Sequence, residues 1–128
     1  MSSPTSIALA VTCEPHLARI VRMTAANVAA LSSMSVERVE DIRMAAEEAF
    51  IYACGTAPAK DLHINFEADA THVAMVFELD AESFAEPSSD DPTAAYVDLI
   101  LGSVCDVYEK REAPARLVLD VKADVDAI

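Results

Sequence analysis

The stretch that decides the fold is "EDIRMAAEEAFIYACG", residues 40–55. Apolar residues recur in it at intervals of three and four, which is the spacing of an amphipathic helix. Ser35 is a suitable N-cap for this helix, and Gly55 with Pro58 shortly after it is typical of a helix end. The pattern predicts a long helix with one side against a core. That side consists of Val39, Ile42, Ala46, Ala49, Phe50 and Ala53.

Four other segments show the alternation of apolar and polar residues that is typical of β-strands. They read "IALAVTC", "LHINFEA", "VAMVFELD" and "LVLDV", at residues 7–13, 62–68, 73–80 and 117–121. Their polar sides carry residues such as His63, Glu78 and Asp120. One apolar side per strand indicates a largely antiparallel sheet that is covered on one face only.

Two further helices are predicted from the same three-and-four spacing. One lies in residues 17–31, just before the long helix, and the other in residues 93–109, after a polar loop at residues 81–92. The whole chain, residues 1–128, is expected to form a single α+β domain. It would be a two-layer sandwich with a mostly antiparallel four-stranded sheet and three helices on one face. The last helix would bury Tyr96, Ile100, Leu101, Val104 and Tyr108.

Composition and charge narrow the classes of partner. Hydrophobic residues make up 53% of the chain, the mean hydropathy is +0.26 and the formal net charge is −13. Between Lys60 and Lys110 there are twelve Asp and Glu residues and no Lys or Arg. Such a surface repels phosphate backbones and anionic lipids, so neither nucleic acid nor a membrane is expected as a partner. No basic residue precedes the first apolar run, so we expect a cytoplasmic protein without a signal peptide.

The cysteines and histidines suggest neither a disulfide framework nor a metal site. Cys13, Cys54 and Cys105 are odd in number, lie far apart and form no CxxC pair, so they are expected to be reduced core thiols. The histidines are scattered, and no pair has a spacing that favours metal binding.

The order of elements and the run at residues 40–55 resemble the anti-sigma-factor serine kinases. These belong to the Bergerat-fold (GHKL) ATPases, which also include histidine-kinase catalytic domains. The resemblance extends over nearly the whole chain, from "IALAV" to "LVLDV". It implies that Glu48 matches the family's general base, and that Tyr52 stands where the family has a Mg²⁺-binding asparagine. A phenol does not replace an amide oxygen on magnesium, so the metal position is expected to be lost.

The other nucleotide motifs of the family are also altered in this chain. Asp80 matches the aspartate that pairs with adenine, but the glycine that follows is replaced by Glu82 or deleted. Ala94, Ala95 and Val97 replace glycines of the turn that holds the phosphates. Asp80, Tyr52, Ala94 and Ala95 therefore mark an expected vestigial nucleotide site, with no cofactor and no metal bound.

The resemblance implies a degenerate anti-sigma-factor-like regulator, a pseudoenzyme that binds a protein. The expected partner is a sigma factor or a STAS-type anti-anti-sigma factor, contacted through Arg19 and Arg22 on the first helix. The alternative is an active ATP-dependent serine kinase that uses Mg²⁺, with Glu48 as the base and Asp80 on adenine.

Plainer interpretations stay open for the same residues. Glu48 and Arg22 would then be solvated helix residues, and Tyr52 would fill a gap between the helix and the loop. In another interpretation, the former nucleotide pocket binds a different small molecule. A homodimer through the open sheet face is a further alternative, because that face is partly apolar. Its apolar residues are Ala8, Ala10, Val76 and Val118.

Overall fold

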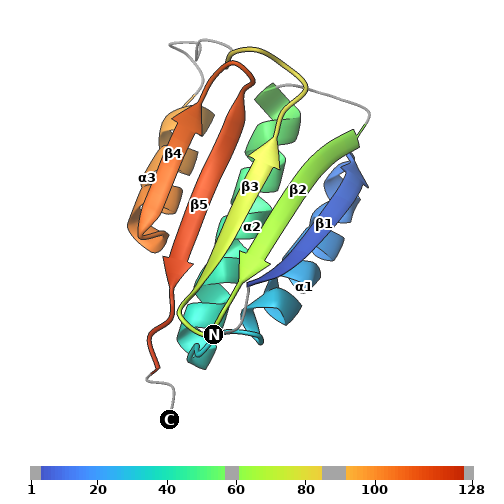
Figure 1. Cartoon of the computed structure of the whole chain (residues 1–128). Helices are drawn as coiled ribbons and strands as arrows, with labels where there is room; N and C mark the ends of the chain where they lie inside the picture. The colour runs from blue at the N-terminus through green and yellow to red at the C-terminus, as the bar shows by residue number, and fades with distance from the viewer. Residues whose placement is uncertain (1–3, 57–60, 85–91, 126–128) are drawn as a thin grey trace.

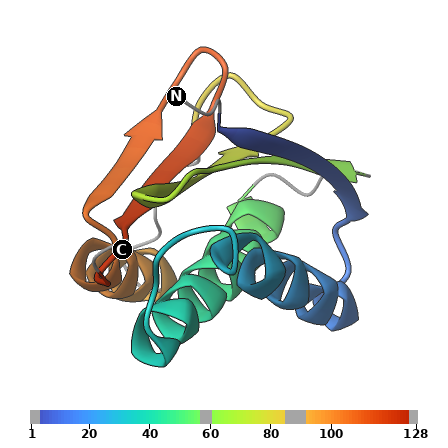
Figure 2. The same ribbon diagram turned by 60° about the horizontal axis from the view of Figure 1, so that its bottom comes forward.

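The computed structural model describes residues 4–56, 61–84 and 92–125 (Figure 1). The described part is an α+β structure of two layers, with an antiparallel sheet on one side and helices on the other (Figure 2). Among these residues, no helix combines the length and the apolar character needed to cross a membrane. The elements in chain order are β1 (Thr5–Thr12), the 3-10 turn η1 (Pro15–Leu17), α1 (Ala18–Ala29), α2 (Val36–Thr56), β2 (Asp61–Ala68), β3 (His72–Glu78), α3 (Thr93–Val104), β4 (Val107–Arg111) and β5 (Arg116–Lys122).

The sheet has five strands in the order β1-β2-β3-β5-β4, and every neighbouring pair is antiparallel. β2 and β3 form a hairpin whose turn is held by Asp69. Its carboxylate accepts hydrogen bonds from the hydroxyl and the N–H of Thr71, at 2.7 and 2.8 Å, and these bonds keep the pKa of Asp69 below its usual value. The order leaves β1 and β4 as the two edges of the sheet.

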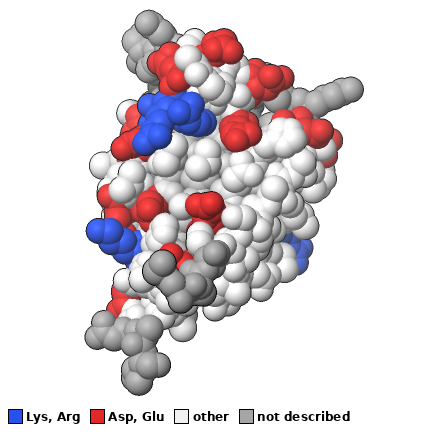
Figure 3. All heavy atoms as spheres, in the orientation of Figure 1, with Lys and Arg blue, Asp and Glu red and all other residues white. Residues whose placement is uncertain are grey.

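Alternation along the central strands sets the two faces of the sheet, as the sequence predicts. The residues on the helix side of β2, β3 and β5 are buried, and those on the other side are exposed or half-buried. Figure 3 shows this open face, with acidic side chains both at its borders and near its middle, basic side chains on its left, and uncharged surface toward the lower right. The buried residues of the three strands are Leu62, Ile64, Phe66, Ala68, Val73, Met75, Phe77, Leu117, Leu119 and Val121.

α2 provides most of the helical side of the core. Ser35 caps its N-terminus as predicted, since its hydroxyl accepts a hydrogen bond from the N–H of Arg38 at 3.1 Å. Phe50 is almost fully buried. The small buried residues of α2 allow the helix backbone to lie close to the sheet. They are Ala45, Ala46, Ala49 and Ala53.

Arg38 joins the start of α2 to the ends of α3 and β5. Its Nε donates to the carbonyl of Lys122 at 2.8 Å, and its Nη1 donates to the carbonyl of Val104 at 3.2 Å. Its Nη2 forms an ion pair with Asp106, and the Asp106 carboxylate also accepts from the N–H of Lys122 at 2.7 Å. One guanidinium thus holds α2, the end of α3 and β5 together.

The last predicted helix is too long, and the predicted count of four strands is wrong. α3 ends at Val104 because Cys105 has an extended backbone, and residues 107–111 pair with β5 as strand β4. Tyr108 is half-buried on this strand, while Tyr96 on α3 is 60% exposed and not part of the core. Backbone pairing with β5 decides the conformation of the Val107–Arg111 segment, and this tertiary contact outweighs its helical spacing.

The expectation of three reduced thiols is also wrong. Cys13, just after β1, and Cys54, near the end of α2, form a disulfide with a Cα–Cα distance of 5.4 Å. They are 41 residues apart in the sequence, and only the packing of α2 under the sheet brings them together. Cys105 remains a free, buried thiol, and burial raises its pKa to about 12.

Thiol titration checks this assignment. We expect the native protein purified without reductant to show no reactive thiol, because Cys105 is buried and protonated. After unfolding without reductant it should show one thiol, and after unfolding with reductant all three. A count of three in the unfolded, unreduced protein would contradict the disulfide.

Replacing Arg38 with methionine tests the bridge between α2 and the sheet. We expect Arg38→Met to lower the free energy of unfolding in urea by about 2 kcal/mol, because charged hydrogen bonds are lost and Asp106 is left without its cation. The control is Arg43→Met, because Arg43 forms an exposed ion pair with Glu40 within α2. That change should cost less than about 0.5 kcal/mol. Equal effects of the two variants would contradict the role of Arg38.

Candidate functional site

Tyr52 lies at the centre of a packed group of side chains between α2, α3 and β4. It is 8% exposed, and its ring stacks on that of Phe84 with centroids 6.4 Å apart and an interplanar angle of 18°. The ammonium of Lys110 lies 4.8 Å from the Tyr52 centroid and 5.9 Å from the Phe84 centroid. These distances fit cation–π contacts, so the Tyr52 ring is covered by a second ring and a cation.

Asp98 on α3 completes this group. Its carboxylate pairs with the Lys110 ammonium at 2.9 Å and accepts a hydrogen bond from the Tyr108 hydroxyl at 2.7 Å. We call the five residues Tyr52, Phe84, Asp98, Tyr108 and Lys110 the Tyr52 cluster. They come from α2, from the segment after β3, from α3 and from β4.

Burial and hydrogen bonds within the cluster shift the pKa values of Tyr108 and Lys110. Burial raises the pKa of the Tyr108 hydroxyl, and the hydrogen bond to Asp98 raises it further, so this phenol stays neutral. Burial lowers the pKa of Lys110, but its hydrogen bonds to Asp98 and Tyr52 outweigh that effect, and the net pKa is raised. Lys110 therefore stays a cation, which suits its ion pair with Asp98.

Glu48 lies on the same side of α2 as Tyr52, one turn earlier. It is half-buried and has no hydrogen bond or ion pair with the described residues. Its neighbour Glu47 is the carboxylate that pairs with α1. Within the described ranges, no group of three or more His, Cys, Asp or Glu side chains could hold a metal ion.

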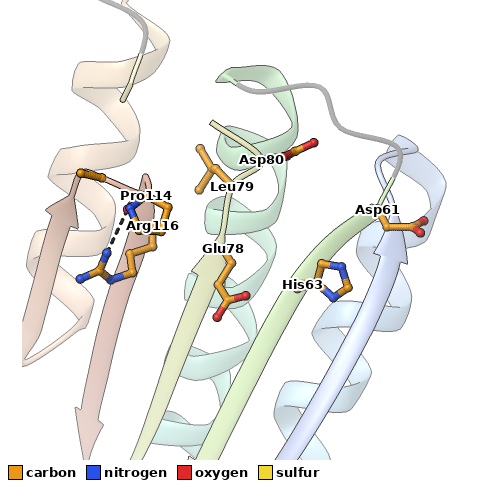
Figure 4. A pocket seen from close by; sticks show the side chains of 8 residues that line it. Asp61, His63, Glu78, Leu79, Asp80, Pro114 and Arg116 are labelled. Carbon is orange, nitrogen blue, oxygen red and sulfur yellow. Dashed lines mark hydrogen bonds between the residues drawn. The ribbon is translucent and has the colours of Figure 1, made fainter. Parts of the chain in front are cut away.

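Asp80 lies in a different place, at the edge of the open sheet face. It is exposed and lines a hollow of about 830 Å³ at the ends of β2, β3 and β5 (Figure 4). His63 and Glu78 lie opposite each other on β2 and β3, and Arg116 donates to the carbonyl of Pro114 at 2.9 Å. Neither Glu48 nor Tyr52 lines this hollow. Asp80 therefore does not share this hollow with the two α2 residues of the predicted site.

The predicted phosphate turn is described only from Pro92 onward. Pro92 is the N-cap of α3 and makes no capping hydrogen bond through its side chain. In the first turn of α3, Ala94 is half-buried against the core and Ala95 is exposed. The preceding loop, residues 85–91, lies outside the described residues.

The two arginines predicted to contact a partner have different surroundings. Arg22 is half-buried, and its Nη1 donates to both carboxylate oxygens of Glu47, at 3.2 and 3.3 Å. Arg19 is exposed and has no ion pair with the residues that the structure describes. Arg22 is thus already neutralised by α2, while Arg19 is open to solvent.

Sequence reasoning missed Lys110 and Asp98 as members of this site. Lys110 directly follows the helix predicted at residues 93–109, so the sequence pattern predicts no neighbour for its side chain. The alternation of side chains in β4 places Tyr108 and Lys110 on the same side of that strand, and this is the signal that could have found the lysine.

Comparison with known proteins adds no family assignment. A scan against protein-family models and a search of the curated proteins both find no match. The resemblance to anti-sigma-factor kinases therefore has no support besides the residues quoted from the sequence.

Proposed function

We propose that this protein is a regulator of the anti-sigma-factor type, which binds a partner protein and has lost its nucleotide site. The observation that carries the proposal is the Tyr52 cluster. In the family that the sequence resembles, the position of Tyr52 belongs to a metal-binding amide. Here it holds a stacked ring with a cation above it.

The charges around the cluster support the loss of nucleotide binding. A triphosphate needs cations or helix N–H groups that are free to receive it. Lys110 is already paired with Asp98 at 2.9 Å, and its ammonium lies over the rings of Tyr52 and Phe84. The chain has only two glycines, Gly55 and Gly102, and neither lies in the first turn of α3, where a phosphate cradle is expected.

The layer order is compatible with a GHKL-type fold. α1 and α2 follow β1 directly, all three helices pack on one face of the sheet, and α2 packs against both α1 and α3. Many proteins of unrelated function can share such a layer order, so the residues of the site carry the functional proposal.

The outer surface of α1 and α2 supports a protein-binding role. Glu47 of the Arg22–Glu47 ion pair lies between Met44 and Ile51 on the same side of α2. Met44, Ile51 and Met23 of α1 are between 42% and 49% exposed. We call Arg19, Met23, Met44 and Ile51 the α1–α2 patch. Exposed methionines suit an adaptable interface, and Arg19 suits an acidic rim on a sigma factor or a STAS-type regulator.

Nucleotide titration separates this proposal from an active kinase. We expect millimolar ATP with Mg²⁺ to leave the melting temperature unchanged, because a ligand stabilises only a protein that binds it. We expect the double variant Tyr52→Asn, Glu82→Gly to gain a measurable ATP-dependent rise, because it restores the amide and the glycine of the family motif.

The matched control is Tyr52→Leu, Glu82→Gly, which removes the ring without adding a metal ligand. It should remain insensitive to ATP. A rise of several degrees in the unmodified protein would overturn the loss of the nucleotide site. Equal responses of the Asn and Leu variants would show that Tyr52 does not occupy the metal position.

Variants of the α1–α2 patch test partner binding. We expect Met44→Glu to weaken binding to the sigma factor or STAS-type regulator of the same organism by at least about tenfold, since an apolar anchor at an interface centre is typically worth more than 1 kcal/mol. The control is Leu99→Glu on α3, where Leu99 is 69% exposed and remote from the patch. Calorimetric titration of the purified partners provides the measurement. Equal affinities of both variants and the unmodified protein would contradict the patch.

A further inference from the structure

The Cys13–Cys54 disulfide closes one end of the α1–α2 helix pair. It bonds a residue just before α1 to a residue near the end of α2, and Arg22 pairs with Glu47 farther along both helices. The start of α1 therefore lies beside the end of α2, and the two helices run antiparallel (Figure 2). The covalent loop at residues 13–54 contains α1, most of α2 and the whole α1–α2 patch.

The opposite end of the helix pair is anchored to the sheet by hydrogen bonds. In the connection between the helices, the N–H of Ser33 donates to the carbonyl of Ala70 at 3.2 Å, and the carbonyl of Ser33 accepts from the N–H of Val125 at 3.1 Å. The N–H of Ser35 donates to the carboxylate of Asp124 at 2.8 Å. None of these bonds involves a cysteine, so reduction of the disulfide leaves this end in place.

The end that carries the disulfide lacks such polar anchors. In the part of the chain that the structure describes, no hydrogen bond or ion pair joins residues 13–21 to residues 48–56. Besides the disulfide, apolar side chains of the core hold this end, among them Val21 and Ala53. Breaking the S–S bond removes the covalent constraint and makes local opening of the helix pair easier.

The disulfide lies where exchange with another thiol is possible. Cys13 and Cys54 are half-buried at the border of the core, and exchange requires that a thiolate reach one of the two sulfurs. Cys105 is buried, and burial raises its pKa to about 12, so it stays protonated and does not attack the bond. The central strands and the Arg38 bridge do not include either sulfur, so the sheet keeps its contacts after reduction.

We propose that the Cys13–Cys54 pair is a reversible redox switch: a dithiol reductant opens the α1–α2 pair at this end and weakens partner binding. The proposal rests on the partner-binding function proposed above. Arg19 and Ile51 are the patch residues closest in sequence to the two cysteines. The intact bond holds the two helices that carry them in one arrangement, and such preorganisation lowers the entropic cost of binding.

The exchange passes two electrons from the dithiol to the cysteine pair. A thiolate of the dithiol attacks one cysteine sulfur, the S–S bond breaks, and a mixed disulfide forms while the released cysteine takes up a proton. The second thiolate of the reductant then displaces the other cysteine, which also takes up a proton, and the reductant leaves as a disulfide. A disulfide oxidant such as oxidised glutathione reverses both steps.

Hydrogen exchange of the full chain, read by peptide mass spectrometry, tests the switch. After treatment with dithiothreitol under native conditions, we expect two reactive thiols, at the residues that form the disulfide. The amides of residues 13–21 and 48–56 should then exchange at least about tenfold faster, because this end opens locally. Exchange in β2, β3 and β5 should not change, and oxidised glutathione should restore slow exchange.

Matched variants separate this pair from the third cysteine. The double variant Cys13→Ser, Cys54→Ser should show fast exchange without reductant. It should also bind the sigma factor or STAS-type regulator of the same organism at least about fivefold more weakly, which is at the low end of typical coupling between two sites. The control Cys105→Ala should keep both the disulfide and the response to dithiothreitol. By linkage, bound partner should shift the ratio of reduced to oxidised dithiothreitol at half-reduction by the same factor.

Three results would overturn the switch: a disulfide that resists dithiothreitol in the folded protein, unchanged exchange after reduction, or equal partner affinities of the double variant and the unmodified protein. Reduction that also unfolds the sheet would show a structural disulfide and not a switch. Absence of partner binding in both redox states would refute the proposed function, and the exchange measurement would still decide whether the helix pair opens.

Discussion

Close packing of α2 against the sheet is the contact on which the other features depend. Ala45, Ala46, Ala49 and Ala53 are fully buried, so the helix lies close to the strands, and Phe50 fills the space beside them. A larger side chain at one of these alanines would push the helix outward at a cost of about 1–3 kcal/mol. The same contact fixes the rotation of α2. Glu48 and Tyr52 are thereby directed to the junction with α3, Arg38 to β5, and Cys54 to Cys13.

Given that rotation, the ring of Tyr52 has energetic consequences for any ligand. A nucleotide at this position would have to displace the stacking on Phe84 and the cation contact of Lys110, which are together worth about 1–3 kcal/mol. It would also have to break the Lys110–Asp98 ion pair. Each 1.4 kcal/mol weakens an affinity tenfold, so even a cleft with all other motifs intact would lose much of its affinity. We regard the cluster as the reason why binding of a protein, and not of a nucleotide, is the better proposal.

The elements that the sequence predicts well are those whose pattern is decided locally. β2, β3 and β5 alternate strictly, and α2 has a cap at Ser35 and a continuous apolar side, so their positions follow from side-chain periodicity. The predicted helix at residues 93–109 includes the first three residues of β4, because Tyr108 continues the spacing of α3, and only pairing with β5 makes this segment a strand. The disulfide and the Tyr52 cluster each join residues from distant segments. Neither has a sequence signature, because the folded chain alone creates the proximity.

The unequal distribution of charge along the chain bears on the proposed partner-binding surface. An acidic chain that binds other proteins needs a region where approach is not repelled, and residues 1–36 contain a single acidic residue. α1, which belongs to that region, has three sides with different surroundings. One is taken by the sheet and α2, through Val21 and Arg22; one points outward beside β1, through Ile20; and one faces solvent, through Arg19 and Met23. The α1–α2 patch uses the direction that faces solvent. A partner that approaches Arg19 and Met23 there meets few acidic side chains from residues 1–36, whose only carboxylate side chain is that of Glu14.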